Sequence, residues 1–153
     1  MITIKSPTPA TAHNRAVAAD LITKIDVEQH ACYLNSVRAM LTTDLPLVYV
    51  EGWLVLENSV PIEHGWLEYQ DAVVDVSVLD QEAKDYYAVF RYNQDDIFSG
   101  RRKHWPLFLN RRRHRDQMRQ AFFTIPVNHD EAVAWQYVAR AVTGIGSVIL
   151  TED

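Results

Sequence analysis

The residue of this chain with the greatest potential for chemistry is its single cysteine, Cys32. A thiolate is a strong nucleophile, and a helix N-terminus together with a neighbouring imidazolium lowers the pKa of a thiol from its usual value of about 8.5. A nucleophilic role for Cys32 therefore requires a histidine beside it. Of the six histidines, His64 is the best placed, because it lies within a predicted strand and Asp75 lies on the next one.

The turn between these two strands decides whether His64 and Asp75 can meet. If Gln70 and Asp71 form a two-residue loop, the two side chains are diagonal neighbours on one face of the sheet. A loop centred one residue earlier puts them directly opposite each other, whereas a three-residue loop puts them on opposite faces, since side chains alternate along a strand. The favourable registers leave an apolar opposite face, as a core requires, made of Leu67, Val74, Val76 and Val78.

These residues resemble the transglutaminase-like branch of the papain-like thiol enzymes. The resemblance consists of a Cys near the start of a helix, a strand-borne His followed by Gly and Trp, and an Asp about ten residues later. The order is also similar to that of the small peptidases that remove leader peptides from lasso peptides. The resemblance covers about one third of the chain, and the segments that carry it are Gln29–Asn35, Tyr49–Trp53, His64–Glu68 and Val73–Asp75.

The resemblance implies a role for each residue. Cys32 would be the nucleophile, His64 its base and later the acid for the leaving group, and Asp75 the group that orients the imidazole. The Cys32 backbone N–H, together with Gln29, would supply oxyanion donors. The chain departs from the family pattern in having Val76, where the family often has Pro after its Asp.

The function implied by the resemblance is a cysteine-dependent hydrolase or acyltransferase. It would act on an amide or acyl bond through a thioester intermediate, without a cofactor, on a peptide, a protein or a small acyl or amide substrate. Hydrolysis and acyl transfer share the first half-reaction, so the sequence leaves the choice between them open. Trp66 shares a face with His64 and is predicted to form the wall of a substrate cleft.

Each of these residues also has a structural interpretation. Cysteine is among the residue types most often buried, and a single histidine is more often structural than catalytic. A zinc site is a further alternative, because His30, Cys32, His64 and Asp75 are all zinc-compatible ligands. However, His30 and Cys32 are two residues apart on the predicted helix, so their side chains would point about 200° apart and could not bind the same ion. We therefore predict no metal site, and the joint order and spacing favour the triad.

Charge is distributed unevenly along the chain. The formal net charge is −5, yet residues 101–119 carry a net charge of +7 and the remainder carries −12. Such a segment can bind nucleic acid or an acidic protein, and it can equally be a solvated helix face. The alternative hypothesis is therefore a noncatalytic protein that binds nucleic acid or an acidic partner through this basic segment, whose cations are Arg101, Arg102, Lys103, Arg111, Arg112, Arg113, Arg115 and Arg119.

The elements that must position these residues follow from the periodicity of apolar residues. Asp26 and Gln29 form a predicted capping box, which would place Cys32 in the second turn of its helix, where the field of the helix end has weakened. A helix that begins nearer His30 is the alternative. The predicted helices are Pro9 to about Lys24, about Val27 to Leu41, about Leu109 to Phe123, and Asn128 or Asp130 to Val142; the predicted strands are Leu47–Leu56, Ile62–Tyr69, Ala72–Leu79 and Tyr86–Tyr92.

The succession of these elements predicts an α+β fold, with an antiparallel sheet packed against an N-terminal helix that bears Cys32, and with C-terminal helices. A length of 153 residues with 48% hydrophobic residues fits a single domain, residues 1–153, of which residues 1–9 are expected to be flexible. No apolar stretch approaches the ~20 residues of a membrane span, and we expect neither a secretory signal nor a membrane partner. A single cysteine suits a reducing compartment, so the expected location is the cytoplasm.

Overall fold

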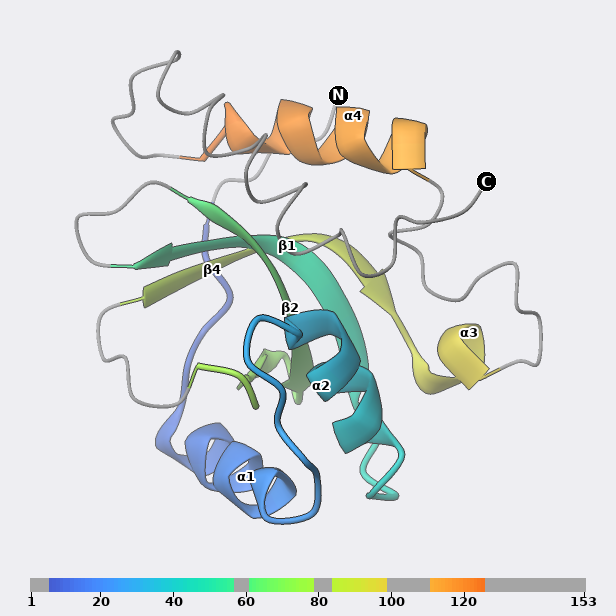
Figure 1. Ribbon diagram of the computed structural model, residues 1–153. Coiled ribbons are helices and arrows are strands. Elements are labelled where there is room, and N and C mark those ends of the chain that lie inside the picture. The colour runs from blue at the N-terminus through green and yellow to red at the C-terminus, as the bar shows by residue number, and fades with distance from the viewer. Residues whose placement is uncertain (1–5, 57–60, 79–83, 99–110, 126–153) are drawn as a thin grey trace.

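The computed structural model of the chain describes residues 6–56, 61–78, 84–98 and 111–125 (Figure 1). It confirms the α+β fold, with a four-stranded antiparallel sheet, a helix that begins at Cys32 before it, and helices after it. The helix expected from Asn128 or Asp130 to Val142 lies outside the described residues. The elements are α1 (Ala12–Ile22), α2 (Cys32–Met40), β1 (Val48–Leu56), β2 (Ile62–Tyr69), β3 (Ala72–Val74), β4 (Lys84–Tyr92), α3 (Gln94–Phe98) and α4 (Arg111–Phe122).

The strand order in the sheet is β3-β2-β1-β4. Strand β1 is central and pairs with β2 from Val48 to Leu54 and with β4 from Tyr49 to Leu56. Its β-branched and aromatic residues suit a strand that is buried on both faces, and most of its residues are buried. The central position of β1 places β2, which carries His64, next to the middle of the sheet.

The sheet curls until its two edge strands come close together. The backbone N–H of Thr8 donates to the carbonyl of Tyr86 in β4 over 2.7 Å, and the carbonyl of the next residue, Pro9, accepts from Val73 N–H in β3 over 2.8 Å. Residues in the expected flexible end, Thr8 and Pro9, are therefore tied to the sheet. The inner side of the curl holds a buried cluster made of Val50, Leu54, Trp66, Val73 and Tyr86.

Helices α2 and α4 pack on the other face of the sheet. Tyr33 and Val37 of α2 join a core cluster with Tyr49 and Leu67. Helix α4 lies over Trp53, whose indole N–H donates to the carbonyl of Met118 over 2.9 Å. Figure 1 shows α4 above the strands and α2 in front of β1 and β2. The sheet is thus covered by helices on one face and filled with its own side chains on the other.

Both N-terminal helices begin later than the sequence predicts. Helix α1 starts at Ala12 with Thr11 as its N-cap, because Thr8 and Pro9 are engaged with the sheet. Helix α2 starts at Cys32 instead of Val27, so the predicted capping box at Asp26 is wrong and the alternative start near His30 is the better one. The reason lies in the backbone of His30, whose φ of 62° is left-handed and interrupts a helix.

Strand β3 is shorter than the predicted strand Ala72–Leu79. It ends at Val74, because the carboxylate of Asp75 accepts hydrogen bonds from the backbone N–H groups of Ser77 and Val78. An aspartate that bonds its own downstream backbone turns the chain out of the sheet. The side chain of Asp75 therefore ends the strand and faces the neighbouring strand at the same time.

Candidate active site

The β2–β3 hairpin has the first of the two registers that allow His64 and Asp75 to meet. Gln70 and Asp71 have φ values of 50° and 60°, which is the left-handed pair required by a two-residue type I′ turn. Tyr69 pairs with Ala72. The imidazole of His64 and the carboxylate of Asp75 consequently lie on the same face, inside the curl of the sheet.

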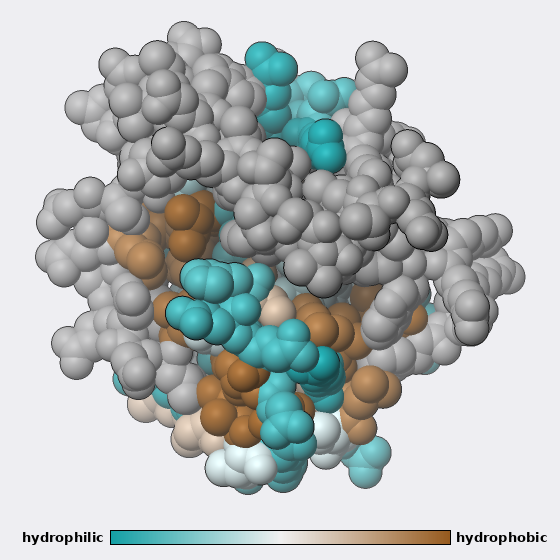
Figure 2. Space-filling model, in the orientation of Figure 1, coloured by the Kyte–Doolittle hydropathy of each residue, from teal (hydrophilic) through white to brown (hydrophobic). Residues whose placement is uncertain are grey.

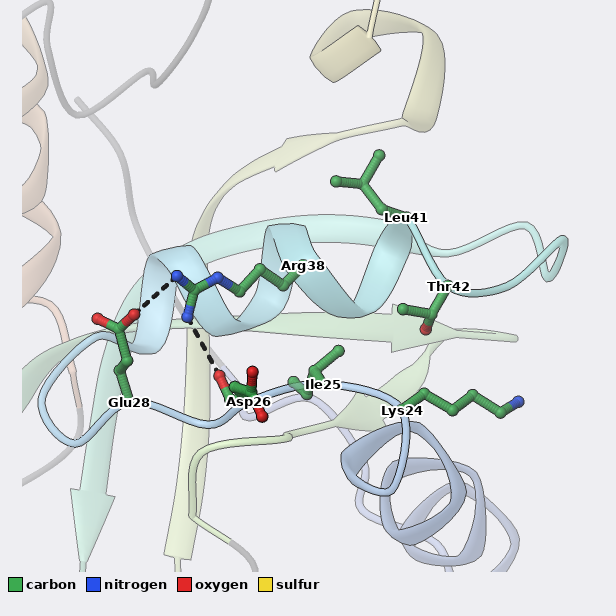
Figure 3. A pocket seen from close by; sticks show the side chains of 7 residues that line it. All are labelled: Lys24, Ile25, Asp26, Glu28, Arg38, Leu41 and Thr42. Atoms are coloured by element: carbon green, nitrogen blue, oxygen red, sulfur yellow. Dashed lines mark hydrogen bonds and ion pairs between the residues drawn. The ribbon is translucent and has the colours of Figure 1, made fainter.

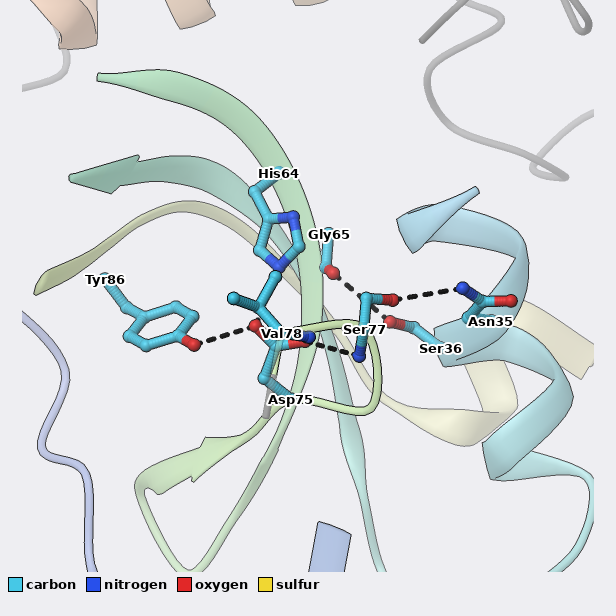
Figure 4. A network of polar contacts seen from close by, with 8 residues as sticks. All are labelled: Asn35, Ser36, His64, Gly65, Asp75, Ser77, Val78 and Tyr86. Carbon is cyan, nitrogen blue, oxygen red and sulfur yellow. Dashed lines mark hydrogen bonds and ion pairs between the residues drawn. The ribbon is translucent and has the colours of Figure 1, made fainter. Parts of the chain in front are cut away.

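His64 and Asp75 form a direct, buried contact. The distance from His64 Nε2 to Asp75 Oδ2 is 2.8 Å, and the exposed fractions of the two residues are 4% and 5%. The same oxygen accepts a hydrogen bond from the hydroxyl of Tyr86 over 2.7 Å. The other oxygen, Oδ1, accepts from Ser77 N–H over 2.8 Å and from Val78 N–H over 3.2 Å (Figure 4). Four donors thus surround one buried carboxylate.

This contact determines which nitrogen of His64 faces the cysteine. An ionised carboxylate only accepts hydrogen bonds, so Nε2 must carry the proton that it shares with Asp75. The other ring nitrogen, Nδ1, points away from Asp75 (Figure 4). Nδ1 is therefore the atom through which the imidazole can exchange a proton with Cys32.

Cys32 is the first residue of α2 and is 6% exposed. Its helix can approach His64 because β3 pairs only with Leu67–Tyr69 and leaves the His64 end of β2 at an edge of the sheet. Gly65 makes the approach close, since a Cβ atom there would lie 2.4 Å from Cδ1 of Tyr33. The hydroxyl of Ser36 also donates to the carbonyl of Gly65 over 3.3 Å. The small residue after His64 therefore allows the cysteine helix to pack onto the histidine strand.

The three groups are coupled electrostatically. Burial alone lowers the pKa of His64, but attraction to Asp75, then to Cys32, and hydrogen bonding to both raise it from 6.5 to about 10. Burial likewise opposes the charge of Asp75, yet His64 and the hydrogen bonds from Tyr86 and Ser77 lower the pKa of that carboxyl from 3.8 to about 2. Both shifts favour an imidazolium and a carboxylate as a buried ion pair beside the sulfur of Cys32.

Asn35 connects the cysteine helix to the loop before it and to the aspartate turn. Its side-chain amide donates to the carbonyl of Glu28 over 2.8 Å and to the hydroxyl of Ser77 over 3.2 Å, and its oxygen accepts from Glu28 N–H over 3.0 Å. Asn35 is fully buried. The side chain of Asn35 thus fixes the segment before Cys32 relative to the segment after Asp75. A polar residue on the buried face of a predicted helix is the feature of the sequence that could have indicated this role.

Two buried tyrosine–carboxylate pairs lie on the helix-covered face near Cys32. The hydroxyl of Tyr33 donates to Glu63 over 2.6 Å, and that of Tyr49 donates to Glu51 over 2.7 Å. Burial, and then the charges of Glu63, Cys32 and Glu51, raise the pKa of Tyr33 well above its usual value. Burial, and then Glu51 and Cys32, do the same to the pKa of Tyr49. The sequence predicted no role for these residues, although an acidic residue at Glu51, between the large core residues Tyr49 and Trp53, is a recognisable signal.

The predicted oxyanion donor Gln29 and the predicted cleft residue Trp66 have different surroundings. Gln29 is exposed in the turn before Cys32. Trp66 does share a face with His64, and its ring stacks on the imidazole with a centroid distance of 6.1 Å. Trp66 is 0% exposed, and within the described residues its indole N–H has no hydrogen-bond partner. The oxyanion role of Gln29 and the cleft role of Trp66 both stay predictions.

A hollow on the described surface lies away from these residues. A cavity of about 370 Å³ opens beside the C-terminal half of α2, where Arg38 forms an ion pair with Glu28 over 2.7 Å and donates to the Asp26 carbonyl over 3.1 Å (Figure 3). Figure 2 shows the described part of this face of the molecule, where a narrow band of hydrophilic residues runs between apolar patches. The cavity is lined by Lys24, Ile25, Asp26, Glu28, Arg38, Leu41 and Thr42, and so by none of the candidate catalytic residues.

The basic segment is described only in part. Arg101, Arg102 and Lys103 lie outside the described residues, and the other five cations belong to α4. Arg115 and Arg119 are exposed. Binding of nucleic acid or of an acidic partner through this segment stays a prediction.

Within the described residues, no three His, Cys, Asp or Glu side chains are grouped so that they could hold a metal ion. Among the helices of these same ranges, none combines the length and the apolar character that crossing a membrane requires.

The fold and the site together define an α+β domain in which a helix-initial cysteine, a strand histidine and an aspartate come together. Comparisons of the chain with protein-family models, with curated proteins and with solved structures found no match. The geometry of the site and the chemistry of its residues are therefore the basis on which a function can be inferred.

Proposed function

We propose that this protein is a cysteine-dependent hydrolase or acyltransferase that acts on an amide or acyl bond. The observation that carries the proposal is the buried hydrogen bond between His64 Nε2 and Asp75 Oδ2, located where the helix that begins with Cys32 meets the sheet. A carboxylate that holds one imidazole nitrogen leaves the other free to serve a nucleophile. The resemblance to transglutaminase-like thiol enzymes supports the same assignment.

In the first half-reaction, Nδ1 of His64 holds the proton that the thiol of Cys32 gives up, so that a thiolate stands beside an imidazolium. The thiolate then attacks the carbonyl carbon of the substrate, and the electron pair of the C=O bond moves to the oxygen. When this tetrahedral intermediate collapses, the bond to the leaving amine or alcohol breaks, and His64 returns its proton to that group. The product that stays on the enzyme is a thioester of Cys32.

The start of α2 supports oxyanion stabilisation. Backbone N–H groups in the first turn of a helix have no partner within the helix, and no side chain of the N-cap residue, Ala31, bonds to them. The N–H of Cys32 is therefore a candidate donor to the oxygen that becomes negative. Gln29 would be the second donor.

In the second half-reaction, a nucleophile attacks the thioester and releases Cys32. His64 removes a proton from that nucleophile and gives it to the departing sulfur. Water as the nucleophile yields a carboxylic acid, and an amine yields a new amide. The proposal covers both outcomes, because the acyl-enzyme is common to them.

The decisive experiment measures the reactivity of Cys32 in the full chain. Iodoacetamide at about pH 6 should alkylate Cys32 about ten times faster than an unstructured cysteine peptide, because an adjacent imidazolium favours the thiolate. His64→Ala should remove this advantage. The exposed histidine His13 provides the matched control, and His13→Ala should leave the rate unchanged. The rate is measured by mass spectrometry of the intact protein.

A p-nitrophenyl ester tests the acyl transfer step directly. The wild-type chain should release p-nitrophenol and gain the mass of one acyl group on Cys32, whereas Cys32→Ser should gain none. If Cys32 reacts with iodoacetamide no faster than the peptide, and gains no acyl group from the ester, then Cys32 is a packing residue.

A further inference from the structure

Tyr86 lies on β4 and reaches across the inside of the curled sheet to the aspartate. Its hydroxyl donates to Oδ2 of Asp75 over 2.7 Å, and this is the oxygen that His64 also uses. Tyr86 is 1% exposed. The centroid of its ring lies 6.3 Å from that of the His64 ring and 5.2 Å from that of the Trp66 ring, so both of these rings pack against Tyr86.

The hydroxyl of Tyr86 limits the motion of the carboxylate. Oδ1 of Asp75 is already held by two backbone N–H groups, those of Ser77 and Val78, so the tyrosine supplies the second fixed point of the carboxylate. A carboxylate held at both oxygens cannot rotate away from the imidazole, and the imidazole is then held as well. Figure 4 shows Tyr86 and His64 approaching the carboxylate of Asp75 from different directions.

The electrostatics of Tyr86 are consistent with a permanent donor. Burial and the charge of Asp75 raise the pKa of Tyr86 far above its usual value of 10.0. The phenol therefore keeps its proton throughout the range in which a thiol enzyme works. In return, its hydrogen bond helps to lower the pKa of Asp75.

We infer that Tyr86 is a positioning residue of the active site: its hydroxyl keeps Asp75 ionised and directed at His64, and through His64 it sets the acid limit of Cys32 reactivity. The inference rests on the proposed function. Tyr86 does not contact the reacting atoms itself, and its effect reaches Cys32 through two other side chains. The sequence alone gives no indication of it, since the tyrosine belongs to a strand at the far edge of the sheet.

The test is the pH dependence of Cys32 alkylation in Tyr86→Phe. This variant keeps the buried ring and removes only the hydroxyl. The acid limb of the profile should move to higher pH, and on that limb alkylation should fall about ten-fold, because Asp75 loses a hydrogen bond that helps to lower its pKa. Tyr92→Phe, on the same strand, is the control whose acid limb should stay in place.

A purely structural role for Tyr86 would give a different result. It would lower the melting temperature of Tyr86→Phe but leave the acid limb of the folded protein at the wild-type pH, and this outcome would overturn the inference. If the wild-type thiol itself is unreactive, or if His64→Ala leaves it fast, the proposed function fails first. The two failures are therefore distinguishable.

A second variant keeps the inference testable if Tyr86→Phe does not fold. 3-Fluorotyrosine incorporated at position 86 retains the ring and makes the hydroxyl a stronger donor. The acid limb should then move to lower pH, and an unmoved limb would contradict the inference. The imidazole N–H resonance of His64, followed by NMR in the same protein, should shift in parallel.

Discussion

Replacement of Asp75 by asparagine separates the charge of the aspartate from its shape. The amide keeps an oxygen to accept the backbone bonds from Ser77 and Val78, but it no longer balances the charge of His64. The pKa of Asp75 falls from 3.8 to about 2 on folding. At about 1.4 kcal/mol per pKa unit, the ionised carboxylate contributes about 2 kcal/mol to the free energy of unfolding at neutral pH.

The expected cost of Asp75→Asn exceeds that contribution. His64 stays buried at 4% exposure and loses its counter-charge. Breaking a buried ion pair by removing one partner costs about 3 to 5 kcal/mol, so we expect a loss of about 3 kcal/mol in free energy of unfolding. Burial then acts on His64 without opposition from Asp75, and the pKa of its imidazole should fall.

The pH dependence of stability follows from the same two groups. Asp75 has a lower pKa in the folded protein than in the unfolded chain, so its contribution is present above pH 3.8 and is lost as the pH falls toward about 2. His64 has a higher pKa in the folded protein, so its contribution is complete below pH 6.5 and is lost as the pH rises through about 10. The pair therefore stabilises the fold most between pH 3.8 and pH 6.5, where both contributions are complete.

Two assays measure the effect of Asp75→Asn. Urea denaturation across this pH range gives the free energy of unfolding, and NMR titration of the His64 ring gives its pKa. Glu68→Gln is the matched control, because Glu68 is a buried carboxylate on β2 whose partner, Arg91, is half exposed. An Asp75→Asn protein with the wild-type acid limb of stability and an unchanged His64 titration would refute the reasoning.

Two further substitutions examine how the cysteine helix is held. Gly65→Ala should lower the free energy of unfolding by about 2 kcal/mol and slow Cys32 alkylation, because the new methyl group would lie 2.4 Å from Cδ1 of Tyr33 and must displace α2; wild-type values in urea denaturation and in the alkylation assay would contradict this. Asn35→Ala should also cost about 2 kcal/mol, since both backbone groups of Glu28 lose their hydrogen bonds to this buried side chain. It should slow alkylation more than Ser77→Ala, which breaks only the 3.2 Å bond to Asn35, and equal effects of the two variants would count against the linking role.

The β2–β3 hairpin could be predicted from the sequence because the interactions that specify it are local. Alternation of apolar and polar residues defines the faces of each strand, and the length of the polar turn at Gln70 and Asp71 fixes the register. These two facts suffice to bring His64 next to Asp75. The order of Cys, His and Asp along the chain likewise sufficed to nominate the three candidate catalytic residues.

The start of the cysteine helix could not be read from the same kind of pattern. Asp26 and Gln29 have the spacing of a capping box, yet the helix begins at Cys32. The segment before it is held by Asn35, which bonds both backbone groups of Glu28, and His30 adopts a left-handed conformation. Contacts of this loop with the folded helix overrode its local preference, as tertiary contacts often do.

What the sequence by itself determined is therefore the class of fold, the histidine–aspartate hairpin and the identity of the nucleophile candidate. The tertiary structure alone decided how these pieces meet. The curl of the sheet brings Tyr86 from one edge strand to Asp75 beside the other, and Gly65 allows the cysteine helix to reach the His64 edge. Periodicity records only which face of its own element a residue occupies, whereas these contacts join separate elements and depend on how the whole sheet bends and packs.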